Sequence, residues 1–320
     1  MNKVNFFIIG AQKSATTSLY NYLSEHPDIF MPQVKENHFF VDDRIYKKGI
    51  AHFHKYYKSY SNEKLIGGAY VHMLSSKEAP ERVYHYNPDA KFLIMLRNPI
   101  DRAYSAYHFA IKNGWESPTT AFMDTIQMEQ QRLHGSLTER TDLSYFYVGL
   151  YSLHLSNWFK YFPKDRFLIL FDSDFFSDTH KEVKKVLQFL SVADSYNINT
   201  NKVYNKSGDV RFKKLHHFLR NKDSKIRQGI GKFLPFGLKS FYRRQILSSI
   251  DKFNKIEKEY KPLPLSDKER LFKYFEEDLK NLSALVGKDV YTLWNPVQRK
   301  TEKDEHNVHI NNSSVNVFNA

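Results

Sequence analysis

The chain of 320 residues contains no cysteine. Disulfide bonds, thiolate metal sites and a cysteine nucleophile are therefore excluded. No apolar run approaches the roughly 20 residues that a membrane-spanning helix needs, and the first residues lack the basic start, apolar stretch and small-residue cleavage site of a signal peptide. We therefore expect a soluble, cytoplasmic protein without a membrane partner.

The composition nevertheless supports a substantial hydrophobic core. Hydrophobic residues make up 41% of the chain and aromatic residues 16%, and the length suffices for one large domain. The sequence shows no internal repeat and no long low-complexity linker. We predict a single domain over residues 1–300, followed by a polar, Asn-rich and disordered tail over residues 301–320.

Positive charge is concentrated in one segment. The formal net charge is +13, and residues 202–244 supply +11 of it, because they contain 13 Lys and Arg and only two acidic residues. The segment could be a solvated basic surface. It could instead produce an electrostatic field that draws anions into a cleft, or bind nucleic acid. No zinc-finger, RNA-recognition or helix-turn-helix signature accompanies it, so we expect no nucleic acid partner.

Apolar runs alternate with helical patterns along the chain. Strands are predicted at residues 4–9, 65–70, 92–96 and 167–171. Helices are predicted from Thr16 to His26, at 51–60, 79–86, from 98 onward, and at 120–133, 143–162 and 177–190. This alternation indicates an α/β fold, with a central, mainly parallel sheet flanked by helices and a helical C-terminal third without a clear strand. Ligands of such folds bind beyond the carboxyl ends of the strands.

The first predicted strand leads into a turn that is rich in small and hydroxyl side chains. The apolar run breaks at Gly10, and a helix begins near Thr16. The first amides of a helix have no intrahelical partners and carry partial positive charge, so the turn is suited to a phosphate or sulfate ester. The candidate binding residues are Gln12, Lys13, Ser14, Ala15, Thr16, Thr17 and Ser18.

The turn is close to a Walker P-loop but does not match it. That motif needs a glycine, four residues and then Gly-Lys, whereas Lys13 comes three residues after Gly10. The sequence also offers no convincing acidic residue for magnesium. A nucleotide kinase is therefore a weak interpretation of this turn. The other alternative to an anion-binding turn is an ordinary strand–turn–helix corner with a surface lysine.

A second motif follows the strand at 92–96. Arg97 comes directly after that strand, Asn98 and Pro99 are typical of a helix start, and Ser105 lies in the second turn of the helix. The guanidinium can bind a phosphate with two hydrogen bonds while the hydroxyl adds a third. The alternative is that Arg97 pairs with an acid such as Asp101 and Ser105 only packs.

Together the two motifs resemble those of sulfotransferases that use 3'-phosphoadenosine 5'-phosphosulfate (PAPS). Residues 10–19 are similar to the family's loop for the 5'-phosphosulfate, and residues 97–105 to its motif for the 3'-phosphate. Residues 36–40, Glu-Asn-His-Phe-Phe, resemble a stretch of the heparan sulfate and related bacterial branch. Residues 149–151 and 205–211 are also similar, so the resemblance covers about residues 3 to 215.

This resemblance implies how the donor would bind. Lys13 would contact the sulfuryl group and the oxygen that bridges it to the 5'-phosphate, while residues 14–18 would cradle that phosphate. Arg97 and Ser105 would bind the 3'-phosphate, and Arg211 would close over the nucleotide. The donor would be PAPS and the product adenosine 3',5'-bisphosphate. Because PAPS is already activated, we expect no metal.

The resemblance also implies a catalytic base. Glu36 matches the base of the glycan branch, and His38 is an alternative because imidazole titrates near neutral pH. Lys13 would offset the charge that develops on the leaving oxygen. One stretch departs from the family pattern: relatives carry a lysine or glutamate where this chain has Gly67-Gly-Ala-Tyr-Val-His72. Tyr70 or His72 could replace that partner.

We therefore predict an enzyme that moves a sulfuryl group from PAPS to a hydroxyl or amine of a carbohydrate or small metabolite, by in-line displacement. The rival interpretations are a nucleotide kinase with a P-loop-like turn, and a non-catalytic binder of nucleic acid or another polyanion. The identity of the acceptor and the oligomeric state do not follow from these motifs.

Overall fold

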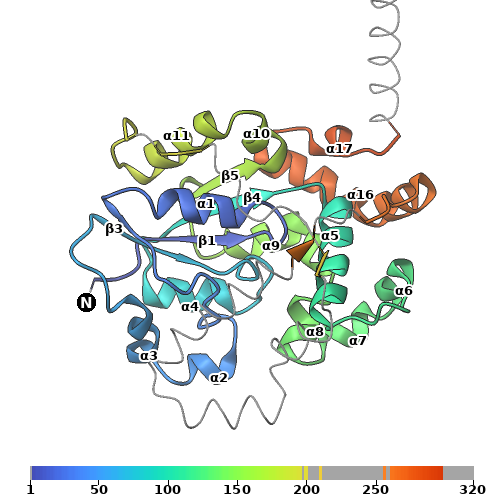
Figure 1. Cartoon of the computed structure of the whole chain (residues 1–320), viewed down its shortest axis with the longest axis horizontal. Coiled ribbons are helices and arrows are strands. Elements are labelled where there is room, and N and C mark those ends of the chain that lie inside the picture. Colours follow the sequence, from blue (N-terminus) through green and yellow to red (C-terminus); the bar gives the residue numbers. More distant parts are fainter. Residues whose placement is uncertain (1, 197, 201–208, 211–254, 257–259, 298–320) are drawn as a thin grey trace, which may run out of the picture. The chain divides into compact units, whose positions relative to one another are not determined.

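The computed structural model describes residues 2–196, 198–200, 209–210, 255–256 and 260–297 (Figure 1). It divides into two compact units. The first comprises Met1–Ala103, Phe146–Tyr204 and Leu263–Ala320, and the second comprises Tyr104–Tyr145 and Asn205–Pro262. The predicted single domain over residues 1–300 stays a prediction. The predicted tail at 301–320 and nearly all of the basic segment at 202–244 lie outside the described residues.

The first unit is built on a parallel sheet of five strands. The strands are β1 Phe6–Gly10, β2 Ile29–Phe30, β3 Leu65–Ala69, β4 Lys91–Leu96 and β5 Phe167–Phe171. Their order is β2-β3-β1-β4-β5, and every neighbouring pair is parallel. Strands β2 and β3 lie on one side of β1 in the sheet, and β4 and β5 lie on the other side. The carboxyl ends of β1 and β4 therefore flank the point where ligands bind in such sheets, and the predicted α/β fold is confirmed.

Helices cover both faces of this sheet (Figure 1). On one face, Phe6, Ile8, Leu93 and Met95 pack against the apolar sides of α1 and α11. On the other face, Phe92 stacks with Phe7 and packs against Trp158 of α9. The helices of the first unit are α1 Thr16–Leu23, α2 Asp43–Tyr46, α3 Ile50–His54, α4 Ala79–Tyr86, α9 Tyr151–Trp158, α10 Asp172–Ser177, α11 Thr179–Leu190, α16 Leu265–Val286 and α17 Val290–Leu293. Burial of both faces explains why the predicted strands are apolar throughout.

The second unit begins within α5 (Pro99–Asn113), after Ala103. It contains α6 Phe122–Gln127, α7 Glu129–Leu133 and α8 Leu137–Thr141, together with β6 Asp209–Val210, which pairs antiparallel with β7 Lys255–Ile256. This pairing corrects the expectation that the C-terminal third has no strand. The predicted helix at 120–133 is divided at Met128.

Two other predicted helices are present but begin later than expected. The helix expected at 143–162 begins only with α9 at Tyr151, after a 3-10 turn at Tyr147–Gly149. Its start is stabilised from a distance, because the carboxylate of Asp278 in α16 accepts hydrogen bonds from the amides of Ser152 and Leu153. The helix expected at 177–190 is confirmed from Thr179, where Asp178 caps it by accepting from the Lys181 amide.

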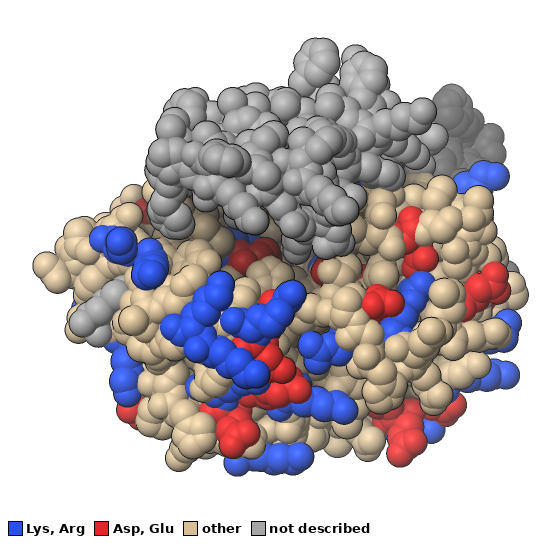
Figure 2. All heavy atoms as spheres, turned by 90° about the horizontal axis from the view of Figure 1, so that it is seen from below, with Lys and Arg blue, Asp and Glu red and all other residues tan. Residues whose placement is uncertain are grey.

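Charges of both signs lie close together on the described surface. Outside residues 202–244 the chain carries a net charge of only +2. On the face shown in Figure 2, acidic side chains lie among the lysines and arginines.

Candidate active site

The turn after β1 has the local conformation that an anion-binding loop needs. The Ala11 amide donates to the Met95 carbonyl oxygen at 2.8 Å, which ties the turn to β4. Lys13 and Ala15 have φ values of 69° and 57°, in the left-handed region that residues other than glycine seldom adopt. Helix α1 then begins at Thr16, as predicted. Backbone strain of this kind is often found at binding sites.

Gly10 allows another segment to pack closely against the turn. A Cβ atom on Gly10 would lie 3.0 Å from Leu74 Cβ and 3.1 Å from the Val71 carbonyl oxygen. The Leu74 amide in turn donates to the Ile9 carbonyl oxygen at 2.9 Å. The segment after β3 therefore forms one wall of the turn.

The turn presents donors that suit an anion. Ser14 Oγ is buried and has no hydrogen-bond partner among the described residues. Ala15, the N-cap of α1, has no side chain that could cap the helix, so the first amides of the helix can donate hydrogen bonds to a ligand. Gln12, Thr16 and Ser18 are also buried, while Lys13 and Thr17 are partly exposed. The residues present thus fit the phosphate or sulfate ester that the sequence predicts.

Arg97 lies next to this turn. Its Nη1 donates to the Lys13 carbonyl oxygen at 3.2 Å, and its Nε lies 3.5 Å from Oδ2 of Asp172. The alternative partner, Asp101, instead pairs with Lys268 at 3.7 Å. The alternative that Arg97 pairs with an acid is therefore met by Asp172, which directly follows β5, and not by the Asp101 given as an example. Binding of the 3'-phosphate by Arg97 stays a prediction. The Tyr151 hydroxyl donates to the Arg97 carbonyl oxygen at 2.9 Å, which steadies the backbone.

These contacts do not test two of the residues that are predicted to bind the phosphate groups of the ligand. Ser105 is buried in α5 but belongs to the second unit, so its joint action with Arg97 stays a prediction. Arg211 lies outside the described residues. The helix start itself is confirmed, since Asn98 Oδ1 accepts from the Ile100 amide at 2.9 Å.

Glu36 lies at the carboxyl edge of the sheet, beside the turn. Its Oε2 accepts a hydrogen bond from the Val71 amide at 3.1 Å, and its Oε1 pairs with Lys35. The Lys35 ammonium is also 3.4 Å from Thr16 Oγ1, at the first residue of α1. Burial, and next the charge of Glu36, raise the pKa of Tyr20 to about 12. The Glu36 carboxylate is therefore linked to the start of α1 through Lys35, and its charge acts on Tyr20 of the same helix.

His38 has a different environment. Its ring lies 4.3 Å from the ring of Tyr70, and Tyr70 lies 5.5 Å from the ring of His72. Both partners are buried. His38 thus has an aromatic contact with Tyr70, whereas Glu36 has polar contacts with Val71 and with Lys35, and Lys35 contacts Thr16 of the turn.

The departure at Gly67 and Gly68 has a steric cause. A Cβ on Gly67 would lie 2.2 Å from Met31 Sδ, and one on Gly68 would lie 2.9 Å from Phe7 Cδ1. Neither position can carry a lysine or glutamate without rebuilding the core. The charged partner of Glu36 is Lys35 instead.

Three residues of this site escaped the sequence analysis. Lys35 directly precedes the Glu-Asn-His-Phe-Phe stretch, and Asp172 directly follows a predicted strand, so position alone was a signal for both. Tyr151 belongs to a stretch that was noted only for its resemblance. Its contact with Arg97 depends on the packing of α9.

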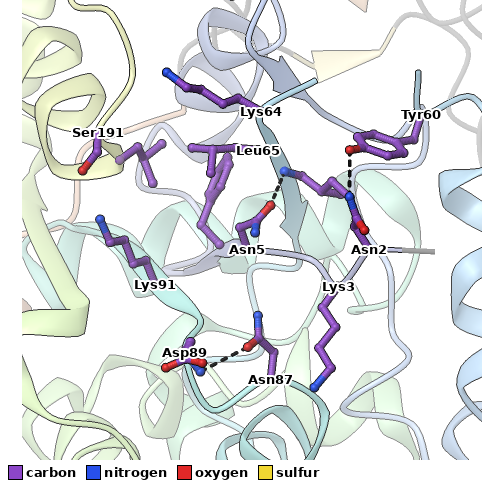
Figure 3. Close-up of a pocket in the computed structure, with 13 residues that line it drawn as sticks. Asn2, Lys3, Asn5, Tyr60, Lys64, Leu65, Asn87, Asp89, Lys91 and Ser191 are labelled. Atoms are coloured by element: carbon purple, nitrogen blue, oxygen red, sulfur yellow. Dashed lines mark hydrogen bonds between the residues drawn. The ribbon is translucent and has the colours of Figure 1, made fainter. Parts of the chain in front are cut away.

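A groove of about 490 Å³ lies elsewhere, at the amino ends of the strands (Figure 3). It is lined by Phe6, Leu65 and Lys91, which are the first residues of β1, β3 and β4. Two of its polar side chains make hydrogen bonds to the backbone. Lys91 donates to the Phe189 carbonyl oxygen, and Asn87 donates to the Val4 carbonyl oxygen. The groove is therefore separate from the turn at the opposite edge.

The described residues contain no group of three or more His, Cys, Asp or Glu side chains arranged to hold a metal ion. Among the helices described, none has the length and apolar character to cross a membrane. The expected independence from metal stays a prediction.

Comparison with known proteins agrees with these motifs. Human heparan sulfate glucosamine 3-O-sulfotransferase 6 is 32% identical over 189 residues, which cover 58% of this chain and 51% of that protein. Mouse heparan sulfate glucosamine 3-O-sulfotransferase 5 is 29% identical over 187 residues, covering 58% and 52%. The chain thus spans about half the length of these curated relatives. A crystal structure of a sulfotransferase from Alicyclobacillus acidocaldarius is similar with a TM-score of 0.66 and 25% identity, covering 92% of this chain and 99% of that one.

The family comparison extends over most of the chain. The model described as "Sulfotransferase domain" matches residues 3–282, which include the turn after β1, Glu36 and Arg97. The chain therefore belongs to the sulfotransferase family.

Proposed function

We propose that this protein transfers the sulfuryl group of PAPS to a hydroxyl or amine of a carbohydrate or small metabolite. The observation that carries the proposal is the position of Glu36 beside the turn, where Lys35 contacts both its carboxylate and Thr16. The carboxylate that would act as the base lies near the part of the chain that suits a sulfate ester. Membership of the sulfotransferase family supports the same reaction.

The residues of the turn would hold the 5' end of the donor. The buried Ser14 hydroxyl and the first amides of α1 offer hydrogen bonds to phosphate oxygens. Lys13 would offset the negative charge that grows on the leaving oxygen as the bond to sulfur breaks. Arg97 would hold the 3'-phosphate, assisted by Ser105 and Arg211. The product would be adenosine 3',5'-bisphosphate.

Glu36 would act on the acceptor. An oxygen or nitrogen nucleophile must lose a proton as it attacks sulfur, and a neighbouring carboxylate can take that proton. The relatives are named for 3-O-sulfation of a glucosamine in heparan sulfate, which makes a carbohydrate hydroxyl the first acceptor to examine. His38 remains the alternative base.

The rival functions are less well supported. Membership of the sulfotransferase family argues against a nucleotide kinase. A non-catalytic polyanion binder would show binding that weakens steeply with salt and no affinity for PAPS or its product. A cytoplasmic location and the absence of a nucleic acid partner stay predictions.

The test is to measure donor binding and turnover in the same preparation. Calorimetry should show binding of adenosine 3',5'-bisphosphate, and radiolabelled PAPS should pass its label to an acceptor in a panel of heparan sulfate, glucosamine and p-nitrophenol. Glu36→Gln should lower kcat by about 100-fold or more, the usual contribution of a general base, with nucleotide affinity nearly unchanged.

His38→Ala is the matched variant for this test. It should retain most of the turnover, because the His38 ring packs against Tyr70, whereas Glu36 is linked to the turn through Lys35. Activity that survives Glu36→Gln and disappears in His38→Ala would transfer the role of base to the histidine. Failure of the protein to bind the bisphosphate at all would reject the proposed function.

A further inference from the structure

We propose that Lys35 is a positioning residue for the reaction, holding the Glu36 carboxylate in place against the donor turn. The inference rests on the proposed function, because it takes Glu36 as the base. It adds a residue that belongs neither to the turn at residues 10–19 nor to the Glu-Asn-His-Phe-Phe stretch at 36–40, and a contact that connects the two.

The contacts of Lys35 connect two parts of the site. Its ammonium pairs with Glu36 Oε1 and lies 3.4 Å from Thr16 Oγ1. Thr16 is the first residue of α1, in the turn that suits the donor, while Glu36 lies in the segment that follows β2. One lysine therefore connects the base with the donor turn across 19 residues of sequence.

The surroundings favour a fixed geometry. The side chain of Lys35 is only 16% exposed, although that of Glu36 is 40% exposed. The second carboxylate oxygen of Glu36 accepts from the Val71 amide at 3.1 Å, and the Asn37 amide donates to the Ala69 carbonyl oxygen at 3.3 Å. The carboxylate is thus held on one side by backbone and on the other by Lys35. One oxygen of a carboxylate can still accept a proton while the group keeps these contacts.

Steric constraints explain why the cation comes from this position. The neighbouring strand β3 has Gly67 and Gly68 where a longer side chain would collide with Met31 and Phe7. A cation for Glu36 cannot come from these two positions. Lys35 reaches the carboxylate from the other side, directly before Glu36 in sequence.

This arrangement predicts how loss of Lys35 acts. Without the ammonium, the carboxylate keeps its backbone contact but can rotate away from the turn, so fewer bound complexes are ready to react. Turnover should fall while donor affinity stays nearly constant. Because Lys35 acts through Glu36, its loss should matter little once Glu36 can no longer accept a proton.

The experiment is a double-mutant cycle on kcat, with radiolabelled PAPS and the best acceptor among heparan sulfate, glucosamine and p-nitrophenol. Lys35→Met should lower kcat by about tenfold or more in the wild-type background and by less than about twofold in the Glu36→Gln background. Lys35→Arg, which keeps the charge, should retain most of the activity. Affinity for adenosine 3',5'-bisphosphate should change by less than about threefold in every variant.

Lys280→Met is the control, since it removes a lysine that pairs at 2.7 Å with Glu276 on the exposed surface of α16. It should leave kcat unchanged. Equal losses from Lys35→Met in both backgrounds would overturn the proposal, as would a tenfold loss of nucleotide affinity, which would make Lys35 a donor ligand. If the wild-type protein neither binds the bisphosphate nor transfers label, the proposed function falls, and this proposal with it.

Discussion

Arg97 is oriented by two contacts that leave part of its hydrogen-bonding capacity available. Its contacts with the Lys13 carbonyl oxygen and with Asp172 involve Nη1 and Nε, and the side chain remains 33% exposed. A guanidinium has five N–H donors in a rigid plane, so these two contacts orient the group without using its full capacity. Asp172 therefore aims the guanidinium, and Lys13 links it to the turn.

This geometry makes a prediction about nucleotide selectivity. Arg97→Ala should weaken binding of adenosine 3',5'-bisphosphate by about tenfold more than binding of adenosine 5'-monophosphate, since a charge-assisted pair contributes on the order of 1.5–3 kcal/mol. Calorimetry with both nucleotides measures the difference. Equal losses for the two would show that Arg97 does not recognise the 3' position.

Arg166→Ala provides a matched control for that measurement. Arg166 is also 33% exposed and also pairs with an aspartate, Asp89, at 3.4 Å. It precedes β5, whereas Arg97 follows β4. Its loss should leave the affinity for both nucleotides unchanged.

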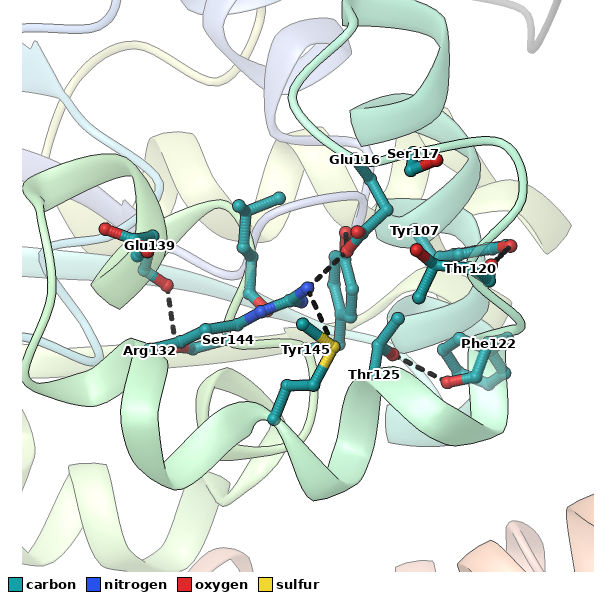
Figure 4. A network of polar contacts seen from close by, with 12 residues as sticks. Tyr107, Glu116, Ser117, Thr120, Phe122, Thr125, Arg132, Glu139, Ser144 and Tyr145 are labelled. Carbon is teal, nitrogen blue, oxygen red and sulfur yellow. Dashed lines mark hydrogen bonds and ion pairs between the residues drawn. The ribbon is translucent and has the colours of Figure 1, made fainter.

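At the scale of single elements, the helices of the second unit depend on a buried ion pair (Figure 4). Arg132 of α7 pairs at 2.8 Å with Glu116, and their side chains are only 7% and 5% exposed. The Tyr145 hydroxyl donates to the same carboxylate at 3.1 Å, and Arg132 Nη1 donates to the Leu143 carbonyl oxygen at 2.9 Å. Burial, and next the charge of Glu116, raise the pKa of Tyr145 well above its usual range. The network joins the loop before α6 to α7 and to the segment after α8.

Breaking this network on one side should be costly. Glu116→Ala leaves the Arg132 charge buried without its carboxylate, and we expect the free energy of unfolding to fall by about 3 kcal/mol. Tyr145→Phe should cost only about 1 kcal/mol, because it removes one hydrogen bond. Urea denaturation measures both changes.

The double variant separates the pair from the packing around it. Glu116→Gln combined with Arg132→Met removes both charges, so it should recover a large part of the loss caused by Glu116→Ala. The single variants Glu116→Gln and Arg132→Met complete the cycle. If the double variant loses as much stability as these two single variants added together, the cost arises from packing and not from the unpaired charge.

At the scale of the whole molecule, one buried histidine makes stability depend on pH. His154 of α9 is buried, and its Nε2 lies 2.7 Å from the Tyr147 carbonyl oxygen. Burial lowers the pKa of His154 to about 4, from an ordinary value near 6.5. The native protein therefore holds this imidazole in its neutral form.

Acid should destabilise the protein through this residue. Between pH 6.5 and about 4 the unfolded chain binds a proton at His154 that the native protein excludes, so the free energy of unfolding falls as pH is lowered through that window. The loss from His154 can reach about 3 kcal/mol at the lower end. Urea denaturation between pH 7.5 and 4.5 should show the decline.

His154→Gln isolates this contribution from other titrating groups. Glutamine can still donate to the Tyr147 carbonyl oxygen but has no charge to gain, so the decline should be shallower in the variant. Burial also raises the pKa of Asp278, and a carboxylate with a raised pKa gives the opposite slope, adding stability as pH falls. A variant whose pH profile matches that of the wild type would show that His154 is not responsible.

The sequence by itself determined the four longer described strands, the turn and the family. The run at 167–171 coincides with β5 and α1 begins at Thr16 as predicted, because apolar runs, turn residues and helix starts are local patterns. The same local patterns placed Lys13 and Glu36 in motifs of the sulfotransferase family. They also misplaced the start of α9, since the cap on that helix comes from Asp278, more than 120 residues away.

Only the tertiary structure decided which charges meet. Leu96 pairs with Phe171 in the ladder between β4 and β5, so the residues that follow them, Arg97 and Asp172, are brought together. Lys35 reaches Thr16 because the segment after β2 folds against the start of α1. Contacts of this kind depend on strand order and register, which join positions far apart in the chain. Sequence position could mark Lys35 and Asp172 as candidates, but it could not show which partners they meet.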